Sequence, residues 1–143
     1  RYGLGWDALG AANPRLVWCS VTGFGQDGPY AARAGYDYIV QGMSGLMSYT
    51  GDPQGEPMKV GVAVVDLFTG VYAAVGLLAA LRERDRTGRG QRLDMALLDV
   101  GVAMAANQAM NFLASGTAPG RLGNQHPNSV PYQVFPCADG HAI

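Results

Sequence analysis

KVGVAVVDLFTGVYAAVGLLAALRERDR, which spans residues 59–86, contains a long apolar run with one carboxylate near its start, Asp66. A helix that is apolar on all sides is typical of a buried one, so this stretch predicts a buried helix. Arginines gather at its end and Gly88 follows. This pattern suits a helix C-terminus, because cations favour the negative helix end and glycine adopts the left-handed turn. Asp66 is therefore predicted near the N-terminus of a buried helix.

The position of Asp66 allows two interpretations. The first backbone N–H groups of a helix lack partners and its N-terminus carries partial positive charge, which favours an ionised carboxylate there. Asp66 can act as the helix N-cap, the more common role, worth about 1 kcal/mol. It can also act as a fixed carboxylate nucleophile in covalent catalysis. Spacing alone leaves both interpretations open.

The same stretch is a poor membrane span. The uncharged run after Asp66 is shorter than the roughly 20 residues that a span needs. Extending the span backwards would place Asp66 in lipid, at a cost of about 2.5–3.5 kcal/mol. The sequence therefore predicts no membrane association.

The composition narrows the class of protein further. The 143 residues suffice for one domain or part of one, and the lack of an initiator Met leads us to expect a fragment. A net charge of -1, from 10 basic and 11 acidic side chains, gives no electrostatic footprint for nucleic acid. Cys19 and Cys137 form no CxxC pair, and Cys19 lies in an apolar run. We therefore expect reduced cysteine and a cytoplasmic protein.

The other elements alternate between helix and strand patterns. Apolar periodicity predicts helices over 6–11, 36–47 and 98–113, buried or half-buried strands over 16–22 and 91–97, and a hairpin over 132–143. This order, with glycine-rich turns between elements, indicates an α/β fold with a largely parallel sheet. Periodicity alone predicts Tyr36 as a core or half-buried aromatic residue, and Asp99 as another N-cap.

Several catalytic motifs are absent from the sequence. Gly23, Gly25 and Gly28 match GxGxxG after a strand, but Pro29 follows at once, so we interpret them as a tight turn. His126 and His141 have no Cys or His at metal-ligand spacing, so no metal site is predicted. There is no GxSxG elbow and no P-loop. Carboxylates remain as the candidate reactive groups, with Asp66 the best placed.

The motifs together resemble one family. In chain order they read NPRLVWCSVTGFGQDGPY, AGYDYIVQGMSGLMSYTG, KVGVAVVDLFTGVYAAVGLLAAL, GRGQRLDMALLD and PYQVFPCADG. This series resembles the class III CoA-transferases over essentially the whole chain. The resemblance implies a Rossmann-like large domain with a mainly parallel sheet, and two chains interlocked as rings in a homodimer. It implies that residues 1–116 are the later part of the large CoA-binding domain and 117–143 a connector toward a smaller domain.

The resemblance also implies the chemistry. The nucleophilic aspartate of the family falls on Asp66, which attacks an acyl-CoA thioester and passes CoA to a carboxylic acid through aspartyl anhydride and aspartyl-CoA intermediates. The N-terminus of the helix is expected to supply N–H donors near the developing negative charge. The CoA-contacting residues of the family fall on Ala34, Gly35, Tyr36, Asp37 and Arg1. CoA is a substrate, and no permanently bound cofactor is implied.

Two other functions stay open beside CoA transfer. The related α-methylacyl-CoA racemases carry a histidine thirty residues before their aspartate, where this chain has Tyr36. An unactivated tyrosine with a pKa near 10 is a poor base at neutral pH, so transfer is favoured over racemisation. A non-catalytic CoA-binding fragment is the third possibility.

Overall fold

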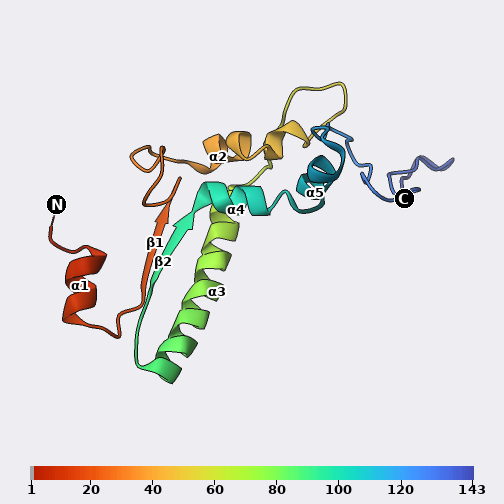
Figure 1. Cartoon of the computed structure of the whole chain (residues 1–143). Coiled ribbons are helices and arrows are strands. Elements are labelled where there is room, and N and C mark those ends of the chain that lie inside the picture. Colours follow the sequence, from red (N-terminus) through yellow and green to blue (C-terminus); the bar gives the residue numbers. More distant parts are fainter. Residues whose placement is uncertain (1) are drawn as a thin grey trace.

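The structure is a computed structural model that describes residues 2–143. Its elements, in chain order, are α1 (Trp6–Ala12), β1 (Trp18–Thr22), α2 (Asp37–Met43), the 3-10 helix η1 (Leu46–Ser48), α3 (Val64–Thr87), β2 (Arg92–Ala96), α4 (Leu97–Ala103) and α5 (Ala106–Ser115). Figure 1 shows α3 running alongside the two strands, with α2 and α4 near one end of them.

The sheet consists of β1 and β2, which pair in parallel with Trp18 opposite Arg92 and Thr22 opposite Ala96. The crossover between them contains α3, which packs against both strands and against α2 and α4. A helical crossover is what parallel strands require, since a short hairpin cannot join them. The predicted α/β class with parallel pairing is therefore confirmed. The strands are only half-buried, with Val21 exposed.

Helix α3 ends where the sequence predicts, but it begins at Val64, later than the start of the predicted stretch at residue 59, and its burial differs. It ends at Thr87, and Gly88 takes the left-handed conformation with φ 76° while its N–H bonds to the Arg84 carbonyl. The prediction that it is buried on all sides is wrong. Its buried residues are Val65, Thr69, Ala73 and Ala80. The exposed apolar residues include Leu67, Val71, Val75 and Leu78. The strands and helices of this chain cover only one side of α3.

In the described part of the chain, α3 is the one helix long and apolar enough to span a membrane by length and composition. Core helices of soluble proteins share this property, so it is weak support for a span. The helix also carries Asp66 in its first turn.

The core lies at the junction of four elements. Val40 of α2, Leu46 of η1, Val65 of α3 and Leu97 of α4 form one buried cluster. Val40 and Val65 are fully buried. Burial of a valine side chain contributes about 1.5–3 kcal/mol, so the first turn of α3 is fixed more firmly than its exposed middle. Asp66 directly follows Val65 and inherits this fixed backbone position.

Three predicted elements differ in the structure. The helix over 36–47 ends at Met43, and a separate 3-10 helix follows at Leu46–Ser48. The single helix over 98–113 is wrong, because α4 ends at Ala103 and α5 begins at Ala106. Ala106 has φ 45°, a left-handed conformation that interrupts a right-handed helix. The hairpin over 132–143 closes through one antiparallel bridge, Pro136 with Ala142, and forms no full strand.

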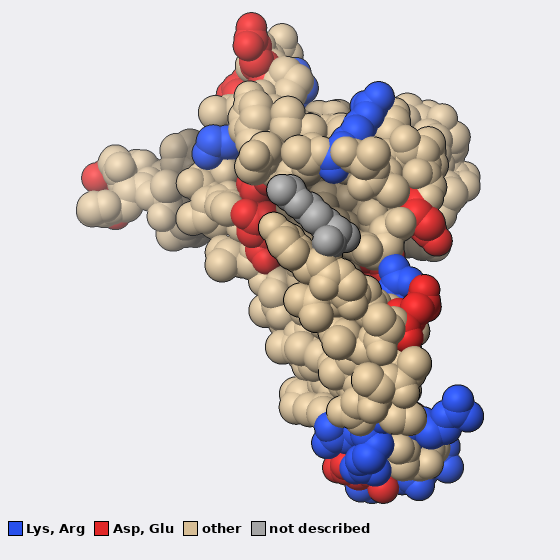
Figure 2. All heavy atoms as spheres, turned by 90° about the vertical axis from the view of Figure 1, so that its left-hand side faces the viewer, with Lys and Arg blue, Asp and Glu red and all other residues tan. Residues whose placement is uncertain are grey.

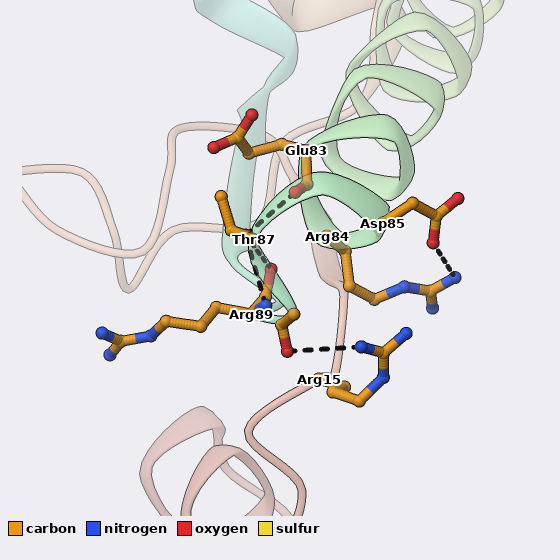
Figure 3. A network of polar contacts seen from close by, with 7 residues as sticks. Arg15, Glu83, Arg84, Asp85, Thr87 and Arg89 are labelled. Carbon is orange, nitrogen blue, oxygen red and sulfur yellow. Dashed lines mark hydrogen bonds and ion pairs between the residues drawn. The ribbon is translucent and has the colours of Figure 1, made fainter.

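The C-terminal end of α3 is tied down by polar contacts (Figure 3). Arg86 pairs with Glu83 at 2.7 Å and holds the pKa of that carboxyl below its usual value. The Thr87 hydroxyl donates to the Glu83 carbonyl at 2.9 Å, and Arg15 donates to the Gly88 carbonyl at 3.5 Å. Figure 2 shows charged side chains gathered at this tip, beside a long surface of mostly uncharged residues. These exposed contacts fix the turn between α3 and β2.

Tyr49 gives a test of the core. It packs against the buried cluster, and its hydroxyl oxygen is buried with no partner among the described residues. Burial raises the pKa of Tyr49 above the ordinary 10.0. The unfolded chain therefore releases the phenol proton at a lower pH than the folded protein does, and the free energy of unfolding falls as the pH rises beyond 10.0. We expect Tyr49→Phe to raise the free energy of unfolding by about 1 kcal/mol and to reduce the alkaline decline. Thermal unfolding of the full-length protein against pH measures both, with the exposed Tyr132→Phe as control.

Candidate functional site

Asp66 is the third residue of α3 and is exposed. The N-cap position belongs to Ala63, which has no side-chain acceptor. The carboxylate of Asp66 makes no hydrogen bond with any residue from 2 to 143 that the structure describes. The N-cap interpretation of Asp66 is therefore wrong. Its oxygens stay free to act on another molecule, while its backbone is held in the first turn of a helix.

The capping acceptor for α3 is Asp37, the first residue of α2. Its Oδ1 accepts hydrogen bonds from the backbone N–H groups of Val65 at 2.8 Å and of Asp66 at 3.2 Å. An acceptor at these positions satisfies two of the donors that a helix start leaves open. The cap thus comes from 28 residues earlier in the chain instead of from the residue before the helix.

This arrangement corrects the expectation that the start of α3 offers free N–H donors to a reacting group. The Val64 N–H bonds to the Val62 carbonyl at 2.8 Å, and the next two N–H groups bond to Asp37. The following one, of Leu67, bonds to the Ala63 carbonyl at 3.1 Å. Any stabilisation of negative charge by direct donation must therefore come from groups other than these.

Gln41 is a residue of this site that sequence reasoning missed. Its side chain is 0% exposed, and its Nε2 donates to Asp37 Oδ2 at 2.5 Å. The same amide accepts from the Val60 N–H at 2.8 Å and donates to the Val62 carbonyl at 3.3 Å. The available signal was the spacing of four residues from Asp37, which places both side chains on one face of a helix. A buried amide with partners on three sides fixes the segment before α3 onto α2.

The segment 34–37 approaches the start of α3 through Asp37. Tyr36 is 71% exposed, so its prediction as a core residue is wrong. Ala34 is also exposed. The basic side chain next to it, Arg33, lies with its guanidinium carbon 4.1 Å above the ring of Tyr30. The structure thus brings Asp66 and this segment together through the hydrogen bond from the Asp66 backbone N–H to the Asp37 carboxylate.

One expected contact, Arg1, lies outside the described residues. The five best-defined cavities of the described residues, of about 190–440 Å³, are lined without Asp66 or Tyr36. Both side chains instead lie on open surface. His126 and His141, from which no metal site was predicted, lie in the segment after α5.

Gly23 and Gly35 explain why the segment can lie where it does. The predicted turn after β1 is confirmed, with φ 88° at Gly25 and φ 84° at Gly28 and no helix directly after them. A Cβ on Gly35 would lie 2.5 Å from the Gly23 Cα, and one on Gly23 would lie 2.4 Å from the Gly35 Cα. The two backbones therefore meet in a space that only glycine allows.

Comparison with known proteins identifies the family. The whole chain, residues 1–143, matches CoA-transferase family III, and the chain belongs to this family. It is 61% identical over 143 residues to the succinate–glutarate CoA-transferase of Agrobacterium fabrum, a match that covers 100% of this chain and 36% of that protein. It is 43% identical over 141 residues to the succinyl-CoA:glutarate CoA-transferase of Mus musculus, covering 99% of this chain and 32% of that protein.

The fold agrees with a solved structure of the same family. A CAIB/BAIF family protein from Brucella suis superposes with a TM-score of 0.87 at 55% identity, over 97% of this chain and 37% of that one. The resemblance inferred from the sequence motifs is confirmed. The chain spans roughly a third of the length of these relatives.

The contact between Gly23 and Gly35 can be tested directly. We expect Gly35→Ala to lower the free energy of unfolding by about 1–3 kcal/mol, because the added methyl group overlaps the Gly23 backbone. Chemical denaturation of the full-length protein measures the change. Gly120→Ala is the matched control, since a Cβ there meets nothing within 4 Å. Equal stability of the two variants would contradict the close approach.

Proposed function

We propose that the protein containing this chain transfers CoA from an acyl-CoA thioester to a carboxylic acid, with Asp66 as the covalent nucleophile. One observation carries the proposal: Asp66 is exposed and makes no hydrogen bond through its carboxylate among the described residues, although it sits in the packed first turn of a helix. A carboxylate that capped its helix would be bonded to the helix N–H groups. Membership of CoA-transferase family III supports the same reaction.

The reaction proceeds by exchange at the Asp66 carboxyl carbon. An Asp66 oxygen attacks the thioester carbonyl and the C–S bond breaks. The products are a mixed anhydride of Asp66 with the acyl group, and CoA as a thiolate. The thiolate attacks the aspartyl carbonyl and releases the donor as a free carboxylate, which leaves an aspartyl-CoA thioester. The acceptor carboxylate attacks this thioester to form a second anhydride and thiolate. The thiolate then attacks the acceptor carbonyl, which gives the new thioester and regenerates Asp66.

In this proposal the residues around Asp66 bind CoA and position it next to the nucleophile. Ala34, Gly35 and Tyr36 form the segment that contacts CoA, which is supported by the exposure of Ala34 and Tyr36 and by the attachment of this segment to the start of α3 through Asp37. The Tyr36 ring offers an apolar surface of substantial area next to the nucleophile helix. Arg1 is proposed as a further contact from the family resemblance alone.

The proposed substrates are short dicarboxylic acids and their CoA thioesters. The relatives at 61% and 43% identity are named for succinate and glutarate. The proposed assembly is the interlocked homodimer implied by the family, in which residues 1–116 belong to the Rossmann-like domain and 117–143 connect to the second domain. A cytoplasmic location stays a prediction from the two unpaired cysteines.

Removal of the nucleophile tests the proposal most directly. We expect Asp66→Asn to reduce CoA transfer from succinyl-CoA to glutarate by about 1,000-fold or more in the full-length protein. Hydroxylamine added during turnover should convert Asp66 of the unmodified protein into its hydroxamate, detected by peptide mass spectrometry. Asp85→Asn, at the other end of the same helix, is the matched control and should retain activity. Activity that survives in Asp66→Asn without any adduct would reject the mechanism.

Isotope exchange separates transfer from racemisation. A racemase exchanges the proton on the α-carbon of its acyl-CoA with solvent, whereas CoA transfer breaks only the thioester bond. We expect no deuterium at that carbon when the full-length protein turns over 2-methylacyl-CoA or succinyl-CoA in heavy water. The absence of a histidine at position 36 supports this result, since Tyr36 is a poor base at neutral pH. Deuterium incorporation without CoA exchange would assign the protein to the racemase class instead.

A further inference from the structure

Asp37 and Gln41 are joined to the nucleophile helix by an unusual set of contacts. Both oxygens of Asp37 are occupied within the protein, Oδ1 by the N–H groups of Val65 and Asp66 and Oδ2 by Gln41. The family resemblance implies that Asp37 contacts CoA, but its carboxylate is already committed to protein donors. These bonds within the protein indicate a structural role of Asp37 beside the implied contact with CoA.

The contacts of Gln41 make the arrangement rigid. Its amide is fully buried and binds the backbone on either side of Gly61, at Val60 and Val62. A buried amide that loses a partner is left with an unsatisfied polar group, so the five hydrogen bonds of this pair favour forming or breaking together. Val40 and Val65 pack in the core directly beside the two side chains. The start of α3 thus has one position relative to α2.

The pair also determines what Asp66 does with its own carboxylate. A helix without a side-chain acceptor at its N-cap leaves its first N–H groups open to any acceptor within reach, including an acidic side chain of the first turn. Asp66 is such a residue, since Ala63 offers no acceptor. Asp37 takes two of these donors, including the N–H of Asp66 itself. The Asp66 carboxylate therefore has no helix donor left to turn toward at those positions.

We propose that Asp37 and Gln41 are a positioning pair that caps α3 in place of Asp66 and so keeps the Asp66 carboxylate free and aimed for attack on the thioester. This inference rests on the proposed function, because it assigns a role relative to a nucleophilic Asp66. Neither side chain touches the reacting atoms. Their effect falls on the rate of acylation of Asp66 and leaves the affinity for CoA unchanged.

Single-turnover kinetics of the full-length protein test the pair. Succinyl-CoA is mixed with enzyme, and the Asp66 adduct is followed by quenching and mass spectrometry, while calorimetry gives the dissociation constant for CoA. Asp37→Asn keeps an oxygen for the helix N–H groups but sets its Nδ2 against the Nε2 of Gln41. We expect acylation to slow by about 10- to 100-fold, as for a small displacement of a reacting group, with the CoA dissociation constant unchanged.

A reversed pair provides the rescue. In the double variant Asp37→Asn with Gln41→Glu, the donor and the acceptor of the bond between the two side chains exchange places and the pair keeps its net charge, while the bond to the Val62 carbonyl is lost in both variants that carry Gln41→Glu. We expect it to acylate faster than Asp37→Asn alone, whereas Gln41→Glu alone sets two carboxylates against each other and slows acylation. Such coupling between the two positions is the signature of a direct interaction. Asp52→Asn is the control, because Asp52 uses its carboxylate only for a local turn contact with the Gln54 N–H.

The outcomes separate the inference from the proposed function. An adduct on Asp66 that forms at the same rate in Asp37→Asn and in the unmodified protein overturns the positioning role and leaves the nucleophile intact. A loss explained entirely by weaker CoA binding assigns Asp37 to CoA contact and also overturns it. A double variant no faster than Asp37→Asn overturns the pairing with Gln41. Absence of any Asp66 adduct in the unmodified protein rejects the proposed function itself.

Discussion

The hydrogen bonds from the start of α3 to the Asp37 carboxylate are the constraint on which the site depends. A helix N-terminus concentrates unsatisfied donors and partial positive charge, and a carboxylate is the side chain best suited to meet both. Here the carboxylate comes from the first turn of another helix, so the cap is also a tertiary contact. It joins α2 to α3 next to Val40 and Val65, which belong to the buried cluster.

Sequence patterns predicted the parts of the fold that local chemistry determines. The end of α3 was predictable because arginines and Gly88 are signals carried by the residues themselves. The parallel strands were predictable from short apolar runs bounded by turn residues. The start of α3 was harder, because its cap lies 28 residues earlier in sequence and no local pattern marks it. The break before α5 carries neither glycine nor proline, and so gave no signal.

Burial was predicted less well than secondary structure, and α3 shows why. An apolar composition indicates that the surface of an element is favourably buried, but it does not indicate which part of a protein buries it. Leu67, Val71 and Val75 are each about 60% exposed here, because β1, β2 and the neighbouring helices reach only the opposite side of α3. Most of the length of the relatives lies outside the matched region. The same reasoning applies to Tyr36, whose ring is exposed and not part of this core.

In the proposed function, the placement of Asp66 resolves a conflict between two uses of one carboxylate. A carboxylate that caps a helix has its lone pairs directed at backbone donors, and those lone pairs are then less available to attack a carbonyl carbon. A carboxylate on a flexible loop has free lone pairs but pays an entropic cost each time it adopts the reactive geometry. Asp66 avoids both, because its backbone is fixed in a packed helical turn while another residue accepts the capping bonds. The separation of capping from attack is therefore a physical condition for a nucleophile at this position, and Asp37 is the residue that meets it.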